Sequence, residues 1–186
     1  MKGNPFNLEP VSAPQPEVPG HLIISASEGE TVDMLLMDLL AVVDEVVGRS
    51  DRCDVLVSST RSLQPVWQAM MLDPDMRSFP WQHVHLWMTD VCSDDWIEES
   101  LIRPSGICET QVHQATPSDS CDVSIVAVEP GGALSSSASW WSRPHDEGGG
   151  TFIFQPASVS IASLELAIAE VPSQADHLRW YLATHA

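Results

Sequence analysis

Short apolar runs alternate along this chain with longer stretches in which apolar residues recur every three or four positions. The first pattern is typical of strands buried on both faces of a sheet, and the second is typical of amphipathic helices. The runs that predict strands lie at residues 21–25, 55–57, 83–88, 122–128 and 151–154. Strands that alternate with helices predict one α/β domain with an open, mostly parallel sheet covered by helices on both faces.

The clearest predicted helix follows the sequence Ser27-Glu-Gly-Glu30. This sequence is a capping box, in which the serine and glutamate side chains bind backbone amides that the helix leaves free. The apolar stripe of the helix runs from Val32 to Val47, and we expect the helix to end near Gly48. Shorter helices are expected at residues 63–72 and 94–102.

The C-terminal part of the sequence has a less regular pattern. In residues 158–171, Leu164 and Ile168 lie on one helical face, yet Leu164, Leu166 and Ile168 also alternate as in a strand. A helix and a strand therefore both stay open for this segment. Residues 173–185 begin with a serine suited to capping, and we expect them to form a helix.

The first 19 residues contain five prolines and few apolar side chains. We expect residues 1–19 to form an extended N-terminal arm and residues 20–186 to form the folded domain. The arm lacks the apolar core of a signal peptide, and no apolar run reaches the roughly 20 residues of a membrane span. These features predict a cytoplasmic protein that does not bind membranes.

The chain has a formal net charge of -18, and Lys2 is its single lysine. A surface this acidic repels phosphate backbones, which excludes nucleic acid as a partner. It also disfavours a phosphorylated sugar, unless a local pocket reverses the field. Cys53, Cys92, Cys108 and Cys121 form no C-x-x-C pair, so we expect reduced thiols, with neither a metal site nor a cofactor.

Polar side chains follow two of the predicted strands, at the strand ends that face the ligand crevice in an open α/β sheet. Ser58, Ser59, Thr60 and Arg61 come directly after the strand at 55–57. Their hydroxyls, the helix-terminal amides and the guanidinium can bind an anion. Alternatively, the hydroxyls only cap the helix that follows.

These segments resemble the signatures of the 6-phosphogluconolactonase and glucosamine-6-phosphate isomerase family, in the same order along the chain. Ser59 and Thr60 match the Ser-Thr of a phosphate loop that usually reads Ser-Gly-Gly-Ser-Thr-Pro. Residues 80–89 match the Trp-x-x-Val-His approach to an acidic strand end, where Asp90 aligns with the aspartate of the family. The resemblance implies a Rossmann-like fold of the sugar-phosphate isomerase type and a phosphorylated sugar as ligand.

The third family signature, Gly-x-Asp-Gly-His-x-Ala-Ser, carries the catalytic histidine of the family. Gly131 and Ser135 match it here, but Gly132 stands in place of the histidine. The two glycines of the phosphate loop are likewise replaced, by Val57 and Ser58. Hydrolysis of a lactone or isomerisation of a sugar needs a base within hydrogen-bond reach of a proton, and glycine supplies none.

We therefore expect a divergent, shortened protein of this type that is non-catalytic and serves as a binding or scaffold module. Its contacts would be Trp140 and Trp141 or self-association. The alternative is an active sugar-phosphate hydrolase or isomerase in which Asp90 is the candidate catalytic residue, and weak ligand binding without turnover lies between the two. An enzyme should show an open polar crevice with a titratable group, whereas a scaffold should fill that crevice with its own side chains.

Two further chemistries are less favoured. His83 and His85 lie two apart on a predicted strand and point the same way, so with Asp90 they suggest a metal site. We favour structural histidines, because the third ligand is distant along the strand. His145 in a glycine-rich segment, together with Ser135, suggests a hydrolase triad, but the chain has no G-x-S-x-G sequence for the nucleophile.

Overall fold

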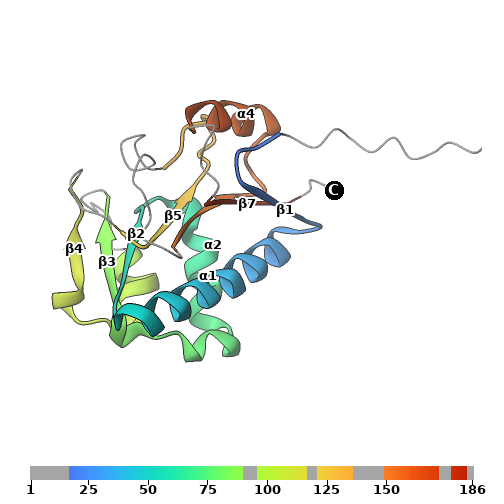
Figure 1. Ribbon diagram of the computed structural model, residues 1–186. Coiled ribbons are helices and arrows are strands. Elements are labelled where there is room, and N and C mark those ends of the chain that lie inside the picture. The colour runs from blue at the N-terminus through green and yellow to red at the C-terminus, as the bar shows by residue number, and fades with distance from the viewer. Residues whose placement is uncertain (1–16, 90–95, 117–120, 136–148, 172–176, 184–186) are drawn as a thin grey trace, which may run out of the picture.

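The computed structural model describes residues 17–89, 96–116, 121–135, 149–171 and 177–183, which form a single open sheet and the helices around it (Figure 1). The sheet has seven strands in the order β1-β7-β6-β5-β2-β3-β4. Every pair of neighbouring strands is parallel, which confirms the predicted α/β architecture. The strands are β1 His21–Ser25, β2 Cys53–Val57, β3 Val84–Met88, β4 Val112–Gln114, β5 Val123–Ala127, β6 Gly150–Gln155 and β7 Leu178–Ala183.

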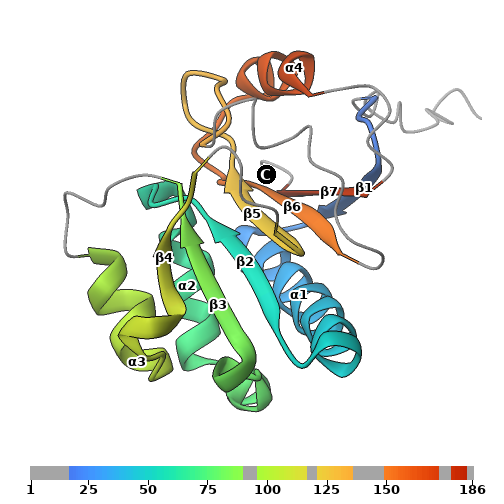
Figure 2. The same ribbon diagram turned by 60° about the vertical axis from the view of Figure 1, so that its left-hand side comes forward.

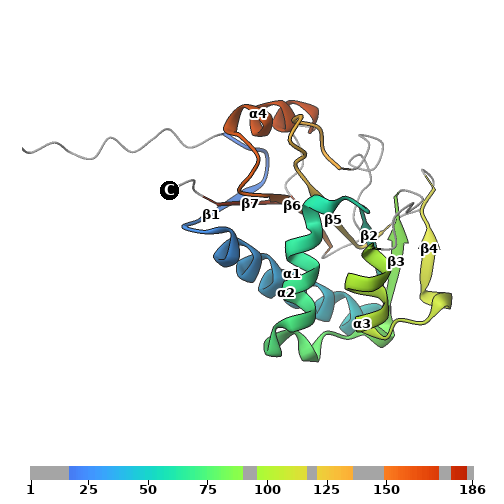
Figure 3. The same ribbon diagram turned by 180° about the vertical axis from the view of Figure 1, so that it is seen from behind.

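Helices cover both faces of the sheet, in two separate layers. Helices α1, α2 and α3 lie on one face, and α4 lies on the other, over β5, β6 and β7 (Figures 1 and 3). The helices are α1 Glu28–Ser50, α2 Gln64–Leu72, α3 Arg103–Ser105 after a π-helical turn at Glu98–Ile102, and α4 Ile161–Glu170. Short 3₁₀ turns are η1 Arg61–Leu63, η2 Pro74–Ser78, η3 Trp81–His83 and η5 Glu109–Gln111.

Helix α1 begins as its capping box predicts. The Ser27 hydroxyl accepts a hydrogen bond from the Glu30 amide at 3.2 Å, and the Glu30 carboxylate accepts one from the Ala26 amide at 2.9 Å. The helix ends at Ser50, two residues beyond Gly48 and close to the predicted end. Asp51 terminates it in the left-handed conformation, with φ of 59°.

The predicted helix at 173–185 is wrong, because residues 178–183 form strand β7 between β1 and β6. Trp180 packs in the core under α4, whereas Tyr181 packs in the core under α1, and both side chains are fully buried. Large apolar side chains on both sides of a short run suit a central parallel strand rather than a helix with one polar face. The ambiguous segment 158–171 contains helix α4, which leaves Leu166 exposed.

The order of the strands reverses between β2 and β5. From β2 the chain proceeds outward through β3 and β4, and it then returns to β5 on the other side of β2 before continuing through β6 and β7 (Figure 2). Ligand crevices in open α/β sheets lie at the carboxyl ends of the strands at such a reversal. The loops after β2 and β5 therefore occupy the place where this architecture puts a ligand.

The expected division at residue 19 lies close to where the described chain begins. Pro19 is held on the domain, because its carbonyl accepts a hydrogen bond of 2.8 Å from the Trp180 indole. Residues 1–16 of the predicted arm lie outside the described part of the chain. Among the described residues, no helix has both the length and the apolar character needed to cross a membrane.

Candidate functional site

The candidate site is built from the segment after β2 and the turn after β5, at the reversal of strand order. Thr60 precedes the 3₁₀ turn η1, and its hydroxyl accepts a hydrogen bond from the Ser62 amide at 3.2 Å. Thr60 therefore caps the helical turn that follows it, which was one of the two roles that the sequence suggested for these hydroxyls. Arg61 begins η1 and is exposed.

A carboxylate from the turn after β5 accepts hydrogen bonds from the hydroxyl groups that follow β2. Glu129, two residues after β5, accepts a hydrogen bond from the Thr60 hydroxyl through Oε1. Its Oε2 accepts a second hydrogen bond of 3.1 Å, from the Ser62 hydroxyl. Sequence reasoning missed Glu129, although an acidic residue in the turn opposite a hydroxyl cluster is a signal that could have found it.

The two loops are joined a second time through buried serines. The Ser58 hydroxyl, which is 1% exposed, donates a hydrogen bond of 2.8 Å to the Ser135 carbonyl. The Ser135 hydroxyl accepts a hydrogen bond of 2.9 Å from the Ala127 amide. Two of the predicted ligand-binding hydroxyls thus form bonds that close the gap between the ends of β2 and β5.

The position that would carry a histidine is closed by helix α4. Gly132 has φ of +82°, and a Cβ atom built on it would lie 2.7 Å from Leu166 Cβ and 3.0 Å from the Ser163 carbonyl oxygen. The Ser163 hydroxyl donates a hydrogen bond of 2.8 Å to the Pro130 carbonyl, which ties the turn to the helix. A side chain at position 132 therefore needs a shift of the turn or of α4. By contrast, a Cβ atom on Gly131 would meet nothing within 4 Å.

The structure brings some predicted site residues together. Ser58, Thr60 and Ser135 meet at the reversal of strand order, and Ser59 is half-buried beside them in the chain. Several other predicted residues lie outside the described part of the chain, namely Asp90, Trp140, Trp141 and His145.

A small cavity lies elsewhere, in the apolar core between the sheet and helices α1 and α2. Leu39, Val55, Trp67 and Leu86 are among its lining residues, and its volume is about 10 Å³. That volume corresponds to roughly one water molecule, so the cavity cannot admit a sugar phosphate.

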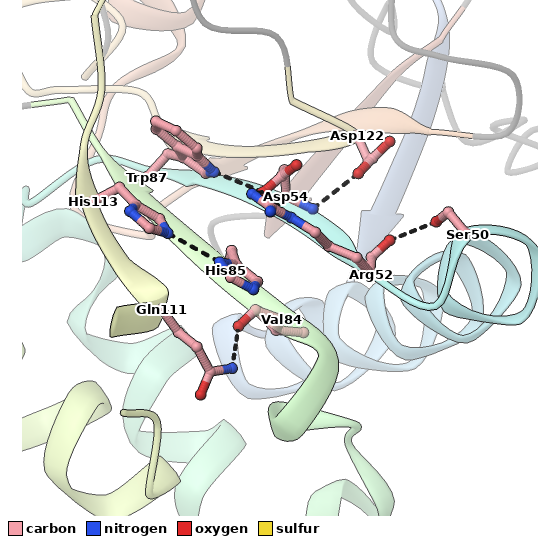
Figure 4. A network of polar contacts seen from close by, with 9 residues as sticks. All are labelled: Ser50, Arg52, Asp54, Val84, His85, Trp87, Gln111, His113 and Asp122. Carbon is pink, nitrogen blue, oxygen red and sulfur yellow. Dashed lines mark hydrogen bonds and ion pairs between the residues drawn. The ribbon is translucent and has the colours of Figure 1, made fainter. Parts of the chain in front are cut away.

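The prediction that His83 and His85 share one strand and point the same way is wrong. His83 lies in the turn η3 rather than in β3, and its Nδ1 is 3.0 Å from the Asp51 carbonyl oxygen. His85 does lie in β3, and its Nδ1 is 2.9 Å from His113 Nε2 (Figure 4). The sequence did not predict strand β4, which carries His113, because its three residues make too short a run.

Three solved structures illustrate the similarity of this fold to known proteins. A 6-phosphogluconolactonase from Thermotoga maritima is 14% identical, with a TM-score of 0.61 over 88% of this chain and 100% of that chain. A monomeric glucosamine-6-phosphate deaminase is 6% identical, with a TM-score of 0.61 over 88% of this chain and 97% of that chain. The 6-phosphogluconolactonase from Trypanosoma brucei is 8% identical, with a TM-score of 0.58 over 90% of this chain and 97% of that chain.

No family model and no curated protein matches this sequence. The structural likeness, at these low identities, shows that the chain has the fold of 6-phosphogluconolactonases and glucosamine-6-phosphate deaminases. Since one fold serves many activities, function depends on the site residues themselves.

Proposed function

Starting from this fold, we propose that the protein is a non-catalytic 6-phosphogluconolactonase-like protein that serves as a binding or scaffold module. The observation that carries the proposal is the Glu129 carboxylate hydrogen-bonded to the hydroxyls of Thr60 and Ser62. The resemblance in sequence puts the phosphate group of a sugar at this hydroxyl cluster. The Glu129 carboxylate, an anion of the chain itself, binds these hydroxyls, and this supports a cluster that does not receive phosphate.

Electrostatics supports this proposal. Two unit charges about 4 Å apart repel each other by roughly 4 kcal/mol at the effective dielectric constant of a site near the protein surface. A phosphate group that approached Thr60 would meet that repulsion from Glu129, in addition to the field of a chain with a formal net charge of -18. The carboxylate thus selects against the very ligand that the fold would otherwise suggest.

Catalysis is disfavoured by a second, independent feature of the site. Ring opening of a lactone by water requires a general base close to the attacked carbonyl carbon. The corresponding position is Gly132, and Leu166 and Ser163 lie within 3.0 Å of where its Cβ atom would stand. No imidazole can occupy this position unless the turn or α4 moves.

Hydrolysis of freshly made 6-phosphogluconolactone tests the proposal. We expect the full-length protein to leave the rate of hydrolysis in buffer unchanged. The alternative, an active sugar-phosphate hydrolase or isomerase, rests on the order of the motifs and on Asp90. A rate enhancement that the variant Asp90→Asn abolishes would overturn the proposal in favour of that alternative.

A further inference from the structure

Helix α1 exposes large apolar side chains on the side that points away from the core. Met37 is 54% exposed and Met34 is 40% exposed, although an amphipathic helix ordinarily presents polar residues to solvent. Residues three apart are neighbours on a helix surface, so the two methionines adjoin. The other exposed large apolar side chains of the described residues lie one to an element, as Ile24 of β1, Leu72 of α2 and Leu166 of α4.

The methionines belong to a stripe with the seven-residue period of a helix that packs on another helix. Positions 34, 37, 41, 44 and 48 recur at intervals of three or four, which places them on one side of α1. All five residues are exposed, and they are Met34, Met37, Ala41, Asp44 and Gly48. The stripe is about 21 Å long, at about 1.5 Å per residue, and a partner helix of four turns matches this length.

The fold does not need this stripe. Buried side chains such as Leu35, Leu39 and Val43 lie on the other side of α1, where they pack in the core below the sheet. A Cβ atom built on Gly48 would meet nothing within 4 Å, so the end of the stripe is open to a close approach. The helix lies beside α2 at the outside of the molecule, which leaves this stripe on the surface (Figure 3).

Carboxylates surround the apolar part of the stripe. Glu30 precedes Met34, Asp33 lies to one side, and Asp44 and Glu45 follow Ala41, all of them exposed. Arg49 is the single basic residue of the helix, whereas its acidic residues are Glu28, Glu30, Asp33, Asp38, Asp44 and Glu45. A surface of apolar side chains with an acidic rim is complementary to a helix with an apolar face and basic flanks.

We propose that the outer stripe of α1 is a docking surface for a basic amphipathic helix of another protein. Apolar side chains of the partner, spaced by three and four, pack on Met34, Met37 and Ala41. A lysine or arginine of the partner faces Asp44, which occupies one position of the stripe itself. Methionine suits this role, because its flexible side chain adapts to the shape of a partner.

The charge of the chain argues against a second copy as the occupant. Each copy has a formal net charge of -18 and would bring the same carboxylates to the interface. The proposal rests on the binding role proposed above and names the partner of that role. A contact of four helical turns is small for a permanent complex, so we expect a transient one with a micromolar dissociation constant.

Fluorescence anisotropy with a labelled peptide tests the proposal on the full-length protein. The probe is a helical peptide of about 15 residues, made of leucine and lysine, with its leucines at intervals of three and four. A scrambled peptide of the same composition has the same charge but no apolar face. At about 0.15 M NaCl, which screens long-range attraction, the amphipathic peptide should bind at least about tenfold more tightly than the scrambled one.

Variants of the stripe locate the bound peptide. Replacing both methionines, as Met34→Gln with Met37→Gln, should weaken binding at least about tenfold, because the apolar contact is lost. Leu166→Gln is the matched control, since it makes the same kind of change at an exposed residue of α4 and should bind as the wild type does. Asp44→Asn should weaken binding more than Glu165→Gln, which removes an exposed carboxylate from α4.

Three results would overturn the proposal: equal affinity for the two peptides, peptide binding that the methionine variants leave unchanged, or a dimer in sedimentation that these variants dissociate. The last would show a second copy on the stripe. Circular dichroism checks the fold of each variant, and Met37→Gln alone repeats the test if the double variant unfolds. Lactone hydrolysis by the wild type would contradict the proposed loss of catalysis and would leave the peptide result unchanged.

Discussion

At the scale of single residues, the chemistry of this protein depends on two positions in one short turn. Glu129 supplies an anion to the hydroxyls of Thr60 and Ser62. Gly132, three residues later, permits a left-handed turn so close to α4 that a Cβ atom there would overlap Leu166. Under the proposed function, Glu129 stands where a phosphate would bind, and Gly132 leaves no room for a basic side chain.

The variant Gly132→His should therefore fail to create an active site. A left-handed conformation costs a residue with a Cβ atom about 1–2 kcal/mol, and the overlap with Leu166 adds about 1–3 kcal/mol. We expect the free energy of unfolding, measured with urea, to fall by about 2–5 kcal/mol. Gly131→Ala is the control, because its Cβ atom would lie in open space and should change the free energy of unfolding by less than about 0.5 kcal/mol. An unchanged stability of Gly132→His would contradict this description of the turn.

The sequence identified the residues at the ends of β2 and β5 but not the partners of their hydrogen bonds. Ser58, Thr60 and Ser135 were selected from the positions of predicted strand ends, and the structure does bring them together. Their partners depend on side-chain directions across two loops that are separated by about 70 positions along the chain, as for Thr60 and Glu129. No local pattern encodes such a contact, which is why Glu129 was missed.

At the scale of elements, strand β7 connects the edge strand β1 to the rest of the sheet. It lies between β1 and β6 and presents Trp180 and Tyr181 to opposite cores. The sequence predicted a helix there, because local patterns could not show that a run of large residues at the end of the chain inserts into the sheet. The earlier strands were predicted well, since each is a short run buried on both faces between segments of helical period.

The link between β7 and α1 can be tested through the Tyr181 hydroxyl, which donates a hydrogen bond of 2.7 Å to Asp38 Oδ2. The variant Tyr181→Phe keeps the ring in the core and removes this bond to a charged acceptor. We expect a loss of about 1–2 kcal/mol in the free energy of unfolding, which corresponds to a fall in Tm of about 2–8 °C. Asp38→Asn keeps an acceptor and should lose less. Equal stability of Tyr181→Phe and the wild type would exclude this bond as a link between the elements.

The Tyr181 hydroxyl should also make the free energy of unfolding depend on pH. Burial and the bond to Asp38 raise the pKa of Tyr181, and the folded state therefore holds the proton more tightly than the unfolded chain does. The contribution of this group to stability is fully present below about pH 10, the ordinary pKa of tyrosine, and declines as the pH rises above it. Tyr181→Phe should thus show a weaker loss of stability than the wild type in this alkaline range.

At the scale of the whole molecule, the fold and the net charge point to different ligands. The chain has the fold of 6-phosphogluconolactonases and of a glucosamine-6-phosphate deaminase. The formal net charge of -18 is unfavourable for any anionic ligand. The packed cores on both faces of the sheet are built from apolar side chains, so the fold itself does not fix an activity.

The charge should also limit stability through repulsion between like charges. Salt at about 1 M reduces the screening length to roughly 3 Å, compared with roughly 30 Å at 0.01 M. We therefore expect Tm to rise between these two concentrations of NaCl. A Tm that falls with added NaCl would show that ion pairs, such as the one between Arg52 and Asp54, outweigh the net repulsion.

The most direct test of the central claim is calorimetric titration of inorganic phosphate into the wild type, Glu129→Ala and Glu165→Ala. Glu165 is an exposed acidic residue on α4, and its variant makes the same change in net charge outside the site. If the Glu129 carboxylate occupies the anion position, Glu129→Ala should bind phosphate at least about tenfold more tightly than the wild type and Glu165→Ala do. Equal phosphate affinity in all three proteins would contradict the account.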